Sequence, residues 1–427
     1  MQKTTLIWFR RNLRLSDNAV LQTAVARGLP LAAVYAAERP SESANPRRAA
    51  FHHQAAAELS AALAVKGIPL FAVQGDPVET LPEWARRLNA QSVLADEAYT
   101  PSETLQDNRI WRILDAEGIA FERINDRAVF AKADIMSEYG RPYAEFAPYK
   151  QAWLQAFRQH FSGERPSETA KIPFQTAFAG LPPFPDAPQA VLAQRGGEQA
   201  AWRQWRQFLP ELDVYPLLKD FPAKKATSQL GAYLSAGCIS PRELAQEAAA
   251  RGADVWLENL IRRDFYYQLA FHHAEMPSEP ENPADAVFFQ RWTKGETGFP
   301  LIDAAMRCLR KSGWLPPVLR QVTAQFWCMT LRQNWQHGAA WFAAQQTDHD
   351  EALNIGNWQA AAGLLSPHAL RVLHPTVAAQ QFDPDGTFIR RHVPELAHLP
   401  KDFIHTPWLA GADIDSHGYP PPLAEAV

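Results

Sequence analysis

The sequence contains little cysteine. Its three cysteines, Cys238, Cys308 and Cys328, stand among 427 residues, and no pair has the C-x-x-C spacing. A disulfide framework and a closed zinc site are therefore excluded. Because disulfides belong to oxidising compartments, the composition favours a reducing one, and we predict a cytoplasmic protein without a bound metal.

Long apolar runs are lacking as well. The N-terminal segment MQKTTLIWFRRNLR has only a few apolar residues before its arginines, too few for the apolar region of a signal peptide. No later stretch approaches the roughly 18 consecutive apolar residues of a membrane-spanning helix. We expect neither a secretory leader nor a membrane span.

Basic residues are not in excess. The chain has 42 lysines and arginines against 46 aspartates and glutamates, a net charge of −4, and the whole imbalance falls beyond residue 200. Nucleic-acid-binding domains are usually basic, so any contact with DNA would depend on a local patch. Hydrophobic residues at 47% and charged residues at 21% are ordinary for a folded protein, which excludes general disorder.

Tryptophan, by contrast, is abundant. Ten of the 14 tryptophans lie beyond residue 200: Trp202, Trp205, Trp256, Trp292, Trp314, Trp327, Trp335, Trp341, Trp358 and Trp408. A single buried tryptophan is usually a packing residue. So uneven a distribution points to a function in the second half of the chain.

The first 130 residues alternate short apolar runs with amphipathic stretches. The predicted strands are residues 5–10, 30–36, 68–75, 92–98 and 119–124. Asp76 and Thr100 each precede a proline and a glutamate at the third helical position, a pattern typical of helix N-termini. This alternation predicts a doubly wound parallel sheet. No G-x-G-x-x-G follows the first strand, so a dinucleotide on that turn is not expected.

The rest of the chain divides into two further segments. Residues 131–200 lose the alternation and contain six prolines between Pro166 and Pro188, so we predict an interdomain linker on the surface. Residues 201–427 have mainly helical apolar spacing, and the capping pattern recurs at Ser240. The predicted fold class is an α/β domain over residues 1–130 and an all-α domain over residues 201–427.

Polar residues of the second half suggest binding sites. Thr227 and Ser228 lie where a helix is predicted to start, which suits phosphate binding, although an ordinary N-cap explains either hydroxyl as well. Asp348 and Asp350 form a D-x-D pair of the kind that holds Mg²⁺. Because no phosphate loop accompanies the pair, we predict no metal.

Several motifs, taken in order, resemble the photolyase/cryptochrome family. They are IWFRRNLRLSDNAVL, FAPYKQAW, DFPAKKATSQLGAYLSAGCISPREL, RWTKGETGFPLIDAAMRCL, HDEALNIGNWQ and FDPDGTFIRRHVPEL. They span nearly the whole chain, and the block between Gly295 and Arg307 is the most diagnostic. The resemblance is closest to the bacterial class that repairs cyclobutane pyrimidine dimers.

This resemblance implies an N-terminal α/β domain, which often holds an antenna chromophore, and a helical domain that binds FAD. It also implies that the reduced flavin, excited by blue light, gives an electron to a flipped-out pyrimidine dimer, whose ring splits before the electron returns. A folate or other antenna is the less supported cofactor. Glu103 matches a folate-contacting position of some relatives, but the capping pattern at Thr100 explains that glutamate better.

Matching positions assign contacts to the flavin. The residues implied to bind FAD are Tyr215, Thr227, Ser228, Gln229, Leu230, Trp256, Asn259, Arg263, Arg320, Asp348, Asp350 and Asn354. We expect Arg320 to pair with Asp348, because a carboxylate beside an anionic flavin would otherwise be repelled. Asn354 matches the residue opposite flavin N5, where a neutral amide can hydrogen-bond without adding charge.

Two tryptophans match the chain that passes electrons to light-excited oxidised flavin. Trp358 and Trp335 correspond to its first two members and, with Asn354, are the predicted catalytic residues. The third, surface tryptophan of the family falls near residue 282, where this chain has Asn282. Either the electron path leaves the protein elsewhere or photoreduction is slow.

The dimer pocket departs further from the family pattern. The residues assigned to DNA are the pocket positions Arg262, Pro317, Val318 and Ala360, together with Lys219 of a candidate basic patch. Arg262 and Ala360 replace tryptophans, Asn259 replaces a glutamate, and the Pro317–Val318 pair replaces an Asn-Arg pair. Stacking on a base contributes about 1–3 kcal/mol, so we expect weakened lesion binding, which the Arg262 guanidinium offsets in part.

The expected function is therefore an FAD-dependent, blue-light-driven photolyase of deoxyribodipyrimidines in DNA. A cryptochrome-like photoreceptor, or a DNA-associated flavoprotein without dimer repair, would keep the same flavin residues and lose the same pocket. An electron-transfer flavoprotein of unrelated biology is a more distant alternative. The candidate basic patch comprises Lys219, Arg262, Arg371, Arg390 and Arg391. Nothing signals oligomerisation, so we expect a monomer.

Overall fold

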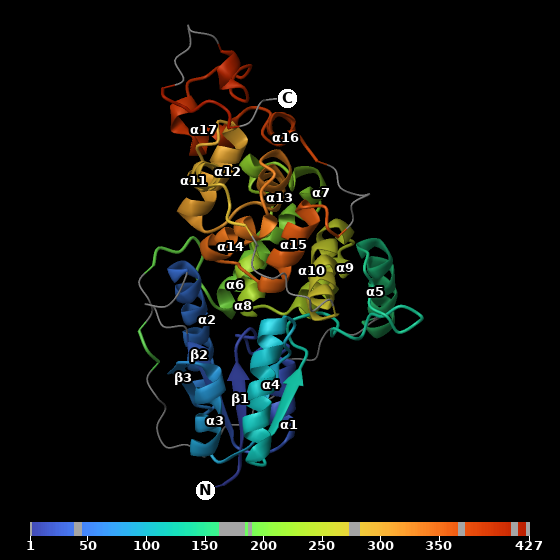
Figure 1. The fold of residues 1–427 in the computed structure, drawn as a ribbon. Helices are drawn as coiled ribbons and strands as arrows, with labels where there is room; N and C mark the ends of the chain where they lie inside the picture. The colour runs from blue at the N-terminus through green and yellow to red at the C-terminus, as the bar shows by residue number, and fades with distance from the viewer. Residues whose placement is uncertain are drawn as a thin grey trace. The chain divides into compact units, whose positions relative to one another are not determined.

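The computed structural model describes residues 2–37, 45–161, 184–186, 190–272, 282–365, 372–410 and 417–423. It separates into two compact units (Figure 1). The first unit comprises residues 1–209 and 229–274, and the second comprises residues 210–228 and 275–427. Each unit is therefore assembled from two separate stretches of chain.

A five-stranded parallel sheet forms the centre of the first unit. Its strands are β1 (Thr4–Phe9), β2 (Leu31–Ala37), β3 (Leu70–Gln74), β4 (Ala90–Asp96) and β5 (Ala120–Ile124). They lie in the order β3-β2-β1-β4-β5, and all neighbouring pairs are parallel. All five predicted strands and the doubly wound parallel sheet are confirmed.

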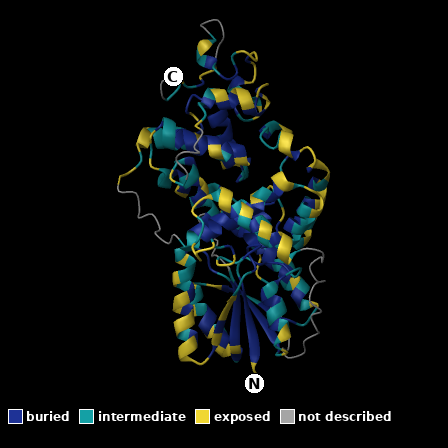
Figure 2. Cartoon of the chain, turned by 90° about the vertical axis from the view of Figure 1, so that its right-hand side faces the viewer, coloured by how far each residue is buried: buried dark blue, intermediate teal, exposed yellow. Residues whose placement is uncertain are grey.

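Helices cover this sheet because right-handed crossovers must connect parallel strands. The helices of the first unit are α1 (Ala19–Ala26), α2 (Pro46–Ala64), α3 (Pro77–Arg87), α4 (Pro101–Ala116), α5 (Phe146–His160), α6 (Glu198–Phe208), α8 (Gly231–Ala236), α9 (Pro241–Ala250) and α10 (Asp254–His272). Figure 2 shows the strands as buried and the outward faces of the flanking helices as exposed. All six residues of β1 are buried, as expected for a central parallel strand.

Helix N-termini in this unit follow the capping chemistry of the sequence. The Asp76 side chain accepts a hydrogen bond from Val78 N–H at the start of α3. Thr100 and Glu103 form a reciprocal capping box at the start of α4. Ser240 accepts from the N–H groups of Arg242 and of Glu243 at the start of α9. The three predicted caps are confirmed.

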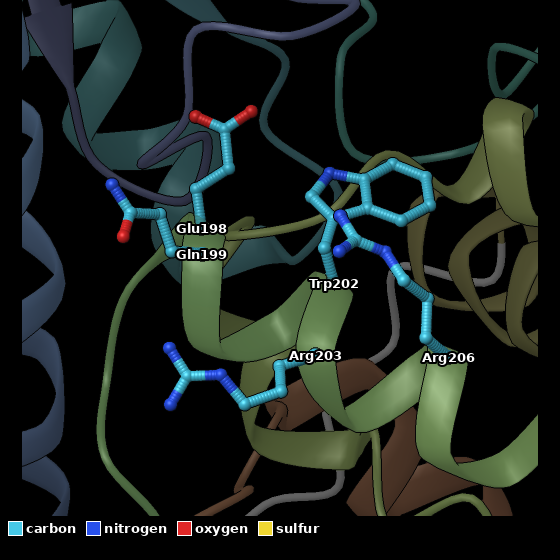
Figure 3. Close-up of a pocket in the computed structure, with 5 residues that line it drawn as sticks. All are labelled: Glu198, Gln199, Trp202, Arg203 and Arg206. Atoms are coloured by element: carbon cyan, nitrogen blue, oxygen red, sulfur yellow. The ribbon is translucent and has the colours of Figure 1, made fainter.

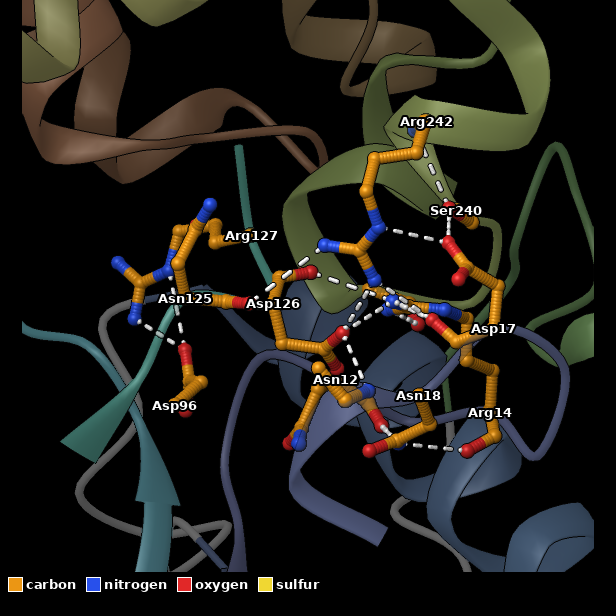
Figure 4. A network of polar contacts seen from close by, with 12 residues as sticks. Asn12, Arg14, Asp17, Asn18, Asp96, Asn125, Asp126, Arg127, Ser240 and Arg242 are labelled. Atoms are coloured by element: carbon orange, nitrogen blue, oxygen red, sulfur yellow. Dashed lines mark hydrogen bonds and ion pairs between the residues drawn. The ribbon is translucent and has the colours of Figure 1, made fainter. Parts of the chain in front are cut away.

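A buried ion-pair network joins α9 to the loops at one end of the sheet (Figure 4). Asp126 pairs with Arg14 at 2.7 Å and with Arg242 at 2.8 Å. Arg242 also pairs with Asp17 at 2.9 Å. Because Arg14 and Asp126 are almost fully buried, removing any one partner would leave an uncompensated charge. The network explains why α9, far along the sequence, belongs to the first unit.

Helix α5 lies inside the predicted linker. Its Trp153 is fully buried and donates its indole N–H to Asp264 of α10 at 3.0 Å. Asp264 also accepts from the backbone N–H groups of Val129 and Phe130, at 3.1 and 3.2 Å. This part of residues 131–200 is thus a packed helix. Most of the proline-rich stretch lies outside the described residues, and the predicted boundaries at residues 130 and 200 remain predictions.

The regular elements among the described residues of the second unit are all helical. Its elements are α7 (Tyr215–Leu218), η2 (Pro222–Lys224), α11 (Ala286–Lys294), α12 (Pro300–Ser312), α13 (Pro317–Gln325), η3 (Phe326–Thr330), α14 (Trp335–Gln345), α15 (Glu351–Ala361), α16 (Pro375–Phe382), α17 (Thr387–His392), η5 (Pro394–Leu396) and η6 (Pro407–Leu409). A short 3-10 turn, η1 (Leu209–Glu211), begins where the first stretch of the first unit ends. The element η3 is a π-helix that directly continues α13.

The most diagnostic motif forms a structural clamp in this unit. Asp303 is fully buried and accepts hydrogen bonds from Thr297 N–H and Oγ1, at 2.7 and 2.6 Å, and from Gly298 N–H at 3.0 Å. Tyr419 donates its hydroxyl to the same carboxylate at 2.5 Å. The motif therefore fixes the turn before α12 and ties a C-terminal segment to it.

Candidate functional site

The predicted site residues divide between the two units. Those in the first unit are Gln229, Leu230, Trp256, Asn259, Arg262 and Arg263. Those in the second are Tyr215, Lys219, Thr227, Ser228, Pro317, Val318, Arg320, Trp335, Asp348, Asp350, Asn354, Trp358 and Ala360.

The expected ion pair forms in the second unit. Arg320, on α13, places its Nη2 2.7 Å from Oδ2 of Asp348, which lies just before α15. The Arg320 Nε donates to the carbonyl of Leu315 at 2.8 Å, which fixes the guanidinium. The other carboxylate oxygen of Asp348, Oδ1, is buried without a hydrogen-bond partner among the described residues. One oxygen of the pair is therefore left to bind another donor.

Two further predicted contacts occupy α15 and its start. Asp350 is 3% exposed and caps α15, accepting from Leu353 N–H at 3.3 Å. Asn354, one turn later, donates its amide to the Ala339 carbonyl of α14 at 3.0 Å. This hydrogen bond orients the Asn354 side chain and leaves its amide oxygen as an acceptor.

Trp358 follows Asn354 by one turn of α15 and is 3% exposed. A Cβ added at Gly338 of α14 would lie 2.2 Å from Trp358 Cη2 and 3.1 Å from Trp327 Cδ1. Gly338 therefore lets two indoles approach the backbone of α14, where any side chain would displace them. Trp335, the first residue of α14, is partly exposed. Asn282 is exposed, and its carbonyl lies 2.9 Å from His337 Nε2.

The predicted helix start at Thr227 and Ser228 is wrong. Helix α8 begins at Gly231 with Leu230 in the N-cap position, so neither hydroxyl caps it. The chain must first turn at Gln229, whose φ of 52° is left-handed, and this delays the helix. Thr227 Oγ1 is instead buried without a hydrogen-bond partner among the described residues.

The remaining residues of this set differ in exposure. Tyr215 is 6% exposed and starts α7. Lys219 is paired with Asp220 at 2.8 Å. Pro317 is exposed, whereas Val318 beside it is 8% exposed and packs in the core. Only the first member of that pair presents its side chain freely.

Among the predicted site residues of the first unit, Arg263 is buried and is held by several contacts. It is 5% exposed, donates through Nη1 to the carbonyl of Arg127 and through Nη2 to the carbonyl of Leu234 at 3.0 Å. Its guanidinium lies over the ring of Tyr267 at 4.7 Å. Its Nε is buried without a hydrogen-bond partner among the described residues. The residue is thus a structural brace with one donor remaining.

Other members of this set are held by their neighbours. Trp256 is 4% exposed and lies against Trp205, with ring centroids 4.6 Å apart. The Gln229 carbonyl accepts from Gln194 Nε2 at 3.1 Å. Leu230 is 2% exposed. Asn259 is exposed and donates its amide to the Trp256 carbonyl at 2.8 Å.

Arg262 lies on the more open side of α10. Its guanidinium is 3.8 Å from the ring centroid of Phe146 on α5, and its Nη2 lies 3.0 Å from Glu258. Lys150 of α5 pairs with the same glutamate at 2.6 Å. The side chain of Arg262 remains 42% exposed. A cation is therefore displayed on an aromatic support where the family places tryptophan.

Glu103, the candidate contact of an antenna chromophore, is already bonded to other residues of the protein. Glu103 closes the capping box of α4 and pairs with Arg127 at 2.8 Å. Burial alone would raise the pKa of the Glu103 carboxyl, but Arg127, Arg11 and Arg10 outweigh it and lower the pKa. The capping interpretation of Glu103 is confirmed.

The basic patch is placed only in part. Arg371 lies outside the described residues. Arg390 donates to the carbonyls of Ala397, Asp385 and Leu399 and is thus a structural brace. Arg391 is exposed at the end of α17.

A surface hollow on α6 is a feature that the sequence did not reveal. Its volume is about 390 Å³, and it is lined by Glu198, Gln199, Trp202, Arg203 and Arg206 (Figure 3). No predicted site residue lines it. Because its polar residues are spaced as one helix face, only the helix boundaries would have pointed to it.

Among the described residues, no group of three or more His, Cys, Asp and Glu side chains is placed to hold a metal ion. None of the helices in that part of the chain is both long and apolar enough to cross a membrane.

Comparison with known proteins agrees with this arrangement. Residues 5–170 match the DNA photolyase family, and residues 256–426 match the FAD binding domain of DNA photolyase. The deoxyribodipyrimidine photo-lyase of Vibrio cholerae is 33% identical, covering 98% of this chain and 96% of its own. The enzyme of the same name from Salmonella typhimurium is 34% identical, covering 99% and 96%.

Solved structures show the same fold. A cryptochrome from Synechocystis superposes with a TM-score of 0.84 at 27% identity, covering 99% of this chain and 96% of its own. A class III photolyase from Agrobacterium tumefaciens gives a TM-score of 0.83 at 26% identity, covering 100% and 95%. The sequence relationship extends over both units, and the chain belongs to the photolyase/cryptochrome family of DNA photolyases.

Proposed function

We propose that this chain is an FAD-dependent, blue-light-driven deoxyribodipyrimidine photo-lyase that repairs pyrimidine dimers in DNA. The observation that carries the proposal is similarity over nearly the full length to enzymes of that name, together with an FAD-binding domain match over residues 256–426. The chain is thus a carbon–carbon lyase and a flavoprotein.

The polar atoms left over within the two units fit this cofactor. In the second unit, Thr227 Oγ1 and Asp348 Oδ1 are buried and unpartnered, and in the first unit Arg263 Nε is. An unsatisfied buried polar group costs about 1–3 kcal/mol, so such groups are expected where a ligand completes them. The hydroxyl, phosphate and ring-nitrogen groups of FAD supply both donors and acceptors.

The residues that would hold FAD are those implied by the resemblance. They are Tyr215, Thr227, Ser228, Gln229, Leu230, Trp256, Asn259, Arg263, Arg320, Asp348, Asp350 and Asn354. Arg320 neutralises Asp348, and Asn354 offers an uncharged amide oriented by the Ala339 carbonyl. Both features suit a reduced, anionic flavin, because neither adds unpaired negative charge.

Bound FAD supplies the light-driven electron chemistry, and the chain orients it and excludes water. Trp358 is proposed to pass electrons to the oxidised cofactor, and the resemblance implies Trp335 as the residue that supplies Trp358. Lys219 and Arg262 are proposed to contact DNA phosphates, whose neutralisation makes affinity fall as salt rises.

The lesion pocket is proposed to be weaker than in typical relatives. Asn259, Arg262, Pro317, Val318 and Ala360 replace residues that the family pattern assigns to dimer contacts. Arg262 on its Phe146 support offers a planar cation that can stack on a base.

A photoreceptor without repair activity is the second candidate. The same five pocket replacements favour it, and a cryptochrome is among the proteins of similar structure. The two candidates differ in one measurable product, because only a photolyase restores the original thymines.

The decisive experiment mixes reduced, FAD-loaded protein with an oligonucleotide that contains a defined thymine dimer. Under blue light we expect restored thymines, detected by chromatography, and no change in the dark. No restored thymine at saturating protein would reject the photolyase in favour of the photoreceptor. Purified protein that retains no flavin would reject both.

Three smaller proposals accompany this function. We propose a monomer, to be measured by light scattering, and a cytoplasmic location. Absorbance of the purified protein beyond that of flavin would reveal a folate or other antenna chromophore.

A further inference from the structure

Four tryptophans of the second unit form one connected group, which we call the tryptophan cluster: Trp292 of α11, Trp327 of η3, Trp341 of α14 and Trp358 of α15. Trp292 is central, with its ring centroid 4.8 Å from Trp327, 5.5 Å from Trp341 and 6.2 Å from Trp358. These distances place the indoles in direct ring contact.

Trp358 is the end of the cluster nearest the proposed flavin residues. It follows Asn354 by four positions on α15, so the two side chains share a helix face. Within the part of the chain that the structure describes, its ring contacts are an edge-to-face contact with Trp292 and another with Phe342, at 5.1 Å. Among the described residues, Trp335 makes no ring contact with Trp358 or with any other aromatic side chain. Contact alone therefore connects Trp358 to Trp292 rather than to Trp335.

The indole N–H groups decide where a positive charge can leave the cluster. Trp292 is fully buried, and its Nε1 has no hydrogen-bond partner among the described residues, so an oxidised Trp292 has no acceptor for its proton. Trp327 is fully buried, with its Nε1 2.8 Å from the Asn334 carbonyl. Trp341 is partly exposed. It is the cluster member from which a proton can reach water.

We propose that electrons reach the flavin through Trp341, Trp292 and Trp358, and that this route replaces the one that the resemblance implies, through Trp335 to position 282. The proposal rests on the proposed function, because it requires FAD beside Trp358. Trp358 gives one electron to photoexcited oxidised flavin, Trp292 gives one to Trp358, and Trp341 gives one to Trp292. Trp341 then releases its indole proton to water. A thiol in solution returns one electron and one proton to Trp341.

The test is transient absorption of the full, FAD-loaded chain, with the long-lived neutral tryptophanyl radical as the readout. Trp341→Phe should remove most of this signal, because the partly exposed indole is lost. Trp292→Phe should do the same by cutting the connection. Trp314→Phe is the matched control, since Trp314 makes no ring contact with the cluster among the described residues, and it should keep the wild-type signal. Thermal unfolding and the flavin spectrum check that each variant is folded and loaded.

The possible failures are distinguishable. Loss of the radical in Trp335→Phe, with wild-type signal in both Trp292→Phe and Trp341→Phe, would overturn the proposed route. Wild-type signal in Trp358→Phe would show that the flavin does not lie beside Trp358, which contradicts the proposed site itself. If Trp292→Phe folds poorly, the Trp341→Phe variant alone can test the route, because Trp341 is partly exposed. Electron paramagnetic resonance of the trapped radical then gives a second readout, since ring-deuterated tryptophan alters the hyperfine couplings of a tryptophanyl radical.

Discussion

Arg320 and Asp348 form an ion pair at 2.7 Å in which the carboxylate is 5% exposed and the guanidinium 27% exposed. The pair is asymmetric, since Asp348 retains a buried oxygen without a partner while Arg320 is braced by the Leu315 carbonyl. Such a pair costs desolvation that its own attraction only partly offsets. The ion pair therefore presents a carboxylate whose charge is neutralised and whose Oδ1 can still accept a hydrogen bond.

Removing the Arg320 cation should reveal the desolvation cost of the buried Asp348 carboxylate. We expect Arg320→Ala to lower the free energy of unfolding by about 1–3 kcal/mol, below the roughly 3–5 kcal/mol of a fully buried pair because Arg320 is partly solvated. The double change Arg320→Ala with Asp348→Asn should recover part of this loss, because no buried charge remains. Urea unfolding of the variants and wild type measures both values. Equal stability of the single and double variants would contradict the assigned role.

Asp264 should make stability depend on pH. Burial raises the pKa of the Asp264 carboxyl to about 6, although hydrogen bonds from Trp153, Phe130 and Val129 and the charge of Arg263 oppose the shift. A raised carboxyl pKa stabilises the fold fully below the unfolded value of about 4, and this stabilisation is lost as pH rises through about 6. We expect a loss of about 3 kcal/mol across that window.

Asp264→Asn removes the titrating group and should flatten this part of the pH profile. Asp254→Asn, at an exposed position of the same helix, is the control for the loss of one aspartate from α10. Chemical unfolding at intervals between pH 4 and pH 7 gives the comparison. A slope that persists in the Asp264 variant would assign it to another group.

Gly338 should not tolerate a side chain. In an exposed helix, Gly→Ala usually stabilises by about 1 kcal/mol, but here the added Cβ would lie 2.2 Å from Trp358. We expect Gly338→Ala to destabilise the protein by about 1–3 kcal/mol, as overpacking does, and to shift tryptophan fluorescence. Ala340→Gly, exposed on the same helix, should cost only its helix propensity. A stabilised Gly338→Ala variant would show that the Trp358 contact is not tight.

Arg262 offers a way to strengthen the lesion pocket. Arg262→Trp restores an aromatic face at a position that lies over Phe146. If the proposed pocket is correct, affinity for dimer-containing DNA should rise by up to about 1–3 kcal/mol, the usual contribution of base stacking.

A second substitution at Arg262 tests the contribution of its charge separately from that of base stacking. Arg262→Ala should weaken binding to all DNA and reduce the salt dependence by about one phosphate contact. Arg251→Ala, at the C-cap of α9 and paired with Glu247, is the charge-matched control. Titrations at several salt concentrations distinguish the effects. Equal salt slopes for Arg262→Ala and wild type would remove Arg262 from the DNA interface.

Local sequence patterns predicted local structure well. The apolar runs at residues 5–10 and 92–98 became β1 and β4 because a central parallel strand is buried on both faces and carries few polar residues. The caps at Asp76 and Thr100 held because a proline and a glutamate follow each at fixed positions. The Arg320–Asp348 pair was predicted from the family resemblance, and charge compensation supplied its physical reason.

Interactions between residues far apart in the sequence were not predicted from it. The Gln229 turn that delays α8 needs a left-handed residue that is not glycine, which composition does not signal. Helix α5 was hidden because its stabilising partners, above all Asp264, lie over a hundred residues away. The tryptophan cluster was invisible for the same reason, since Trp292 contacts Trp358 only once α11 and α15 have packed.

The discontinuous first unit ties folding to the order of synthesis. Asp17 and Asp126 leave the ribosome long before Arg242, their partner at 2.9 and 2.8 Å. The backbone N–H groups of Val129 and Phe130 likewise lack their acceptor until Asp264 has been synthesised. With synthesis at about 5–20 residues per second, the nascent sheet spends many seconds without the groups that complete its polar edge. A chain interrupted soon after its last strand would expose that edge, because the residues of α9 and α10 that complete it would be missing.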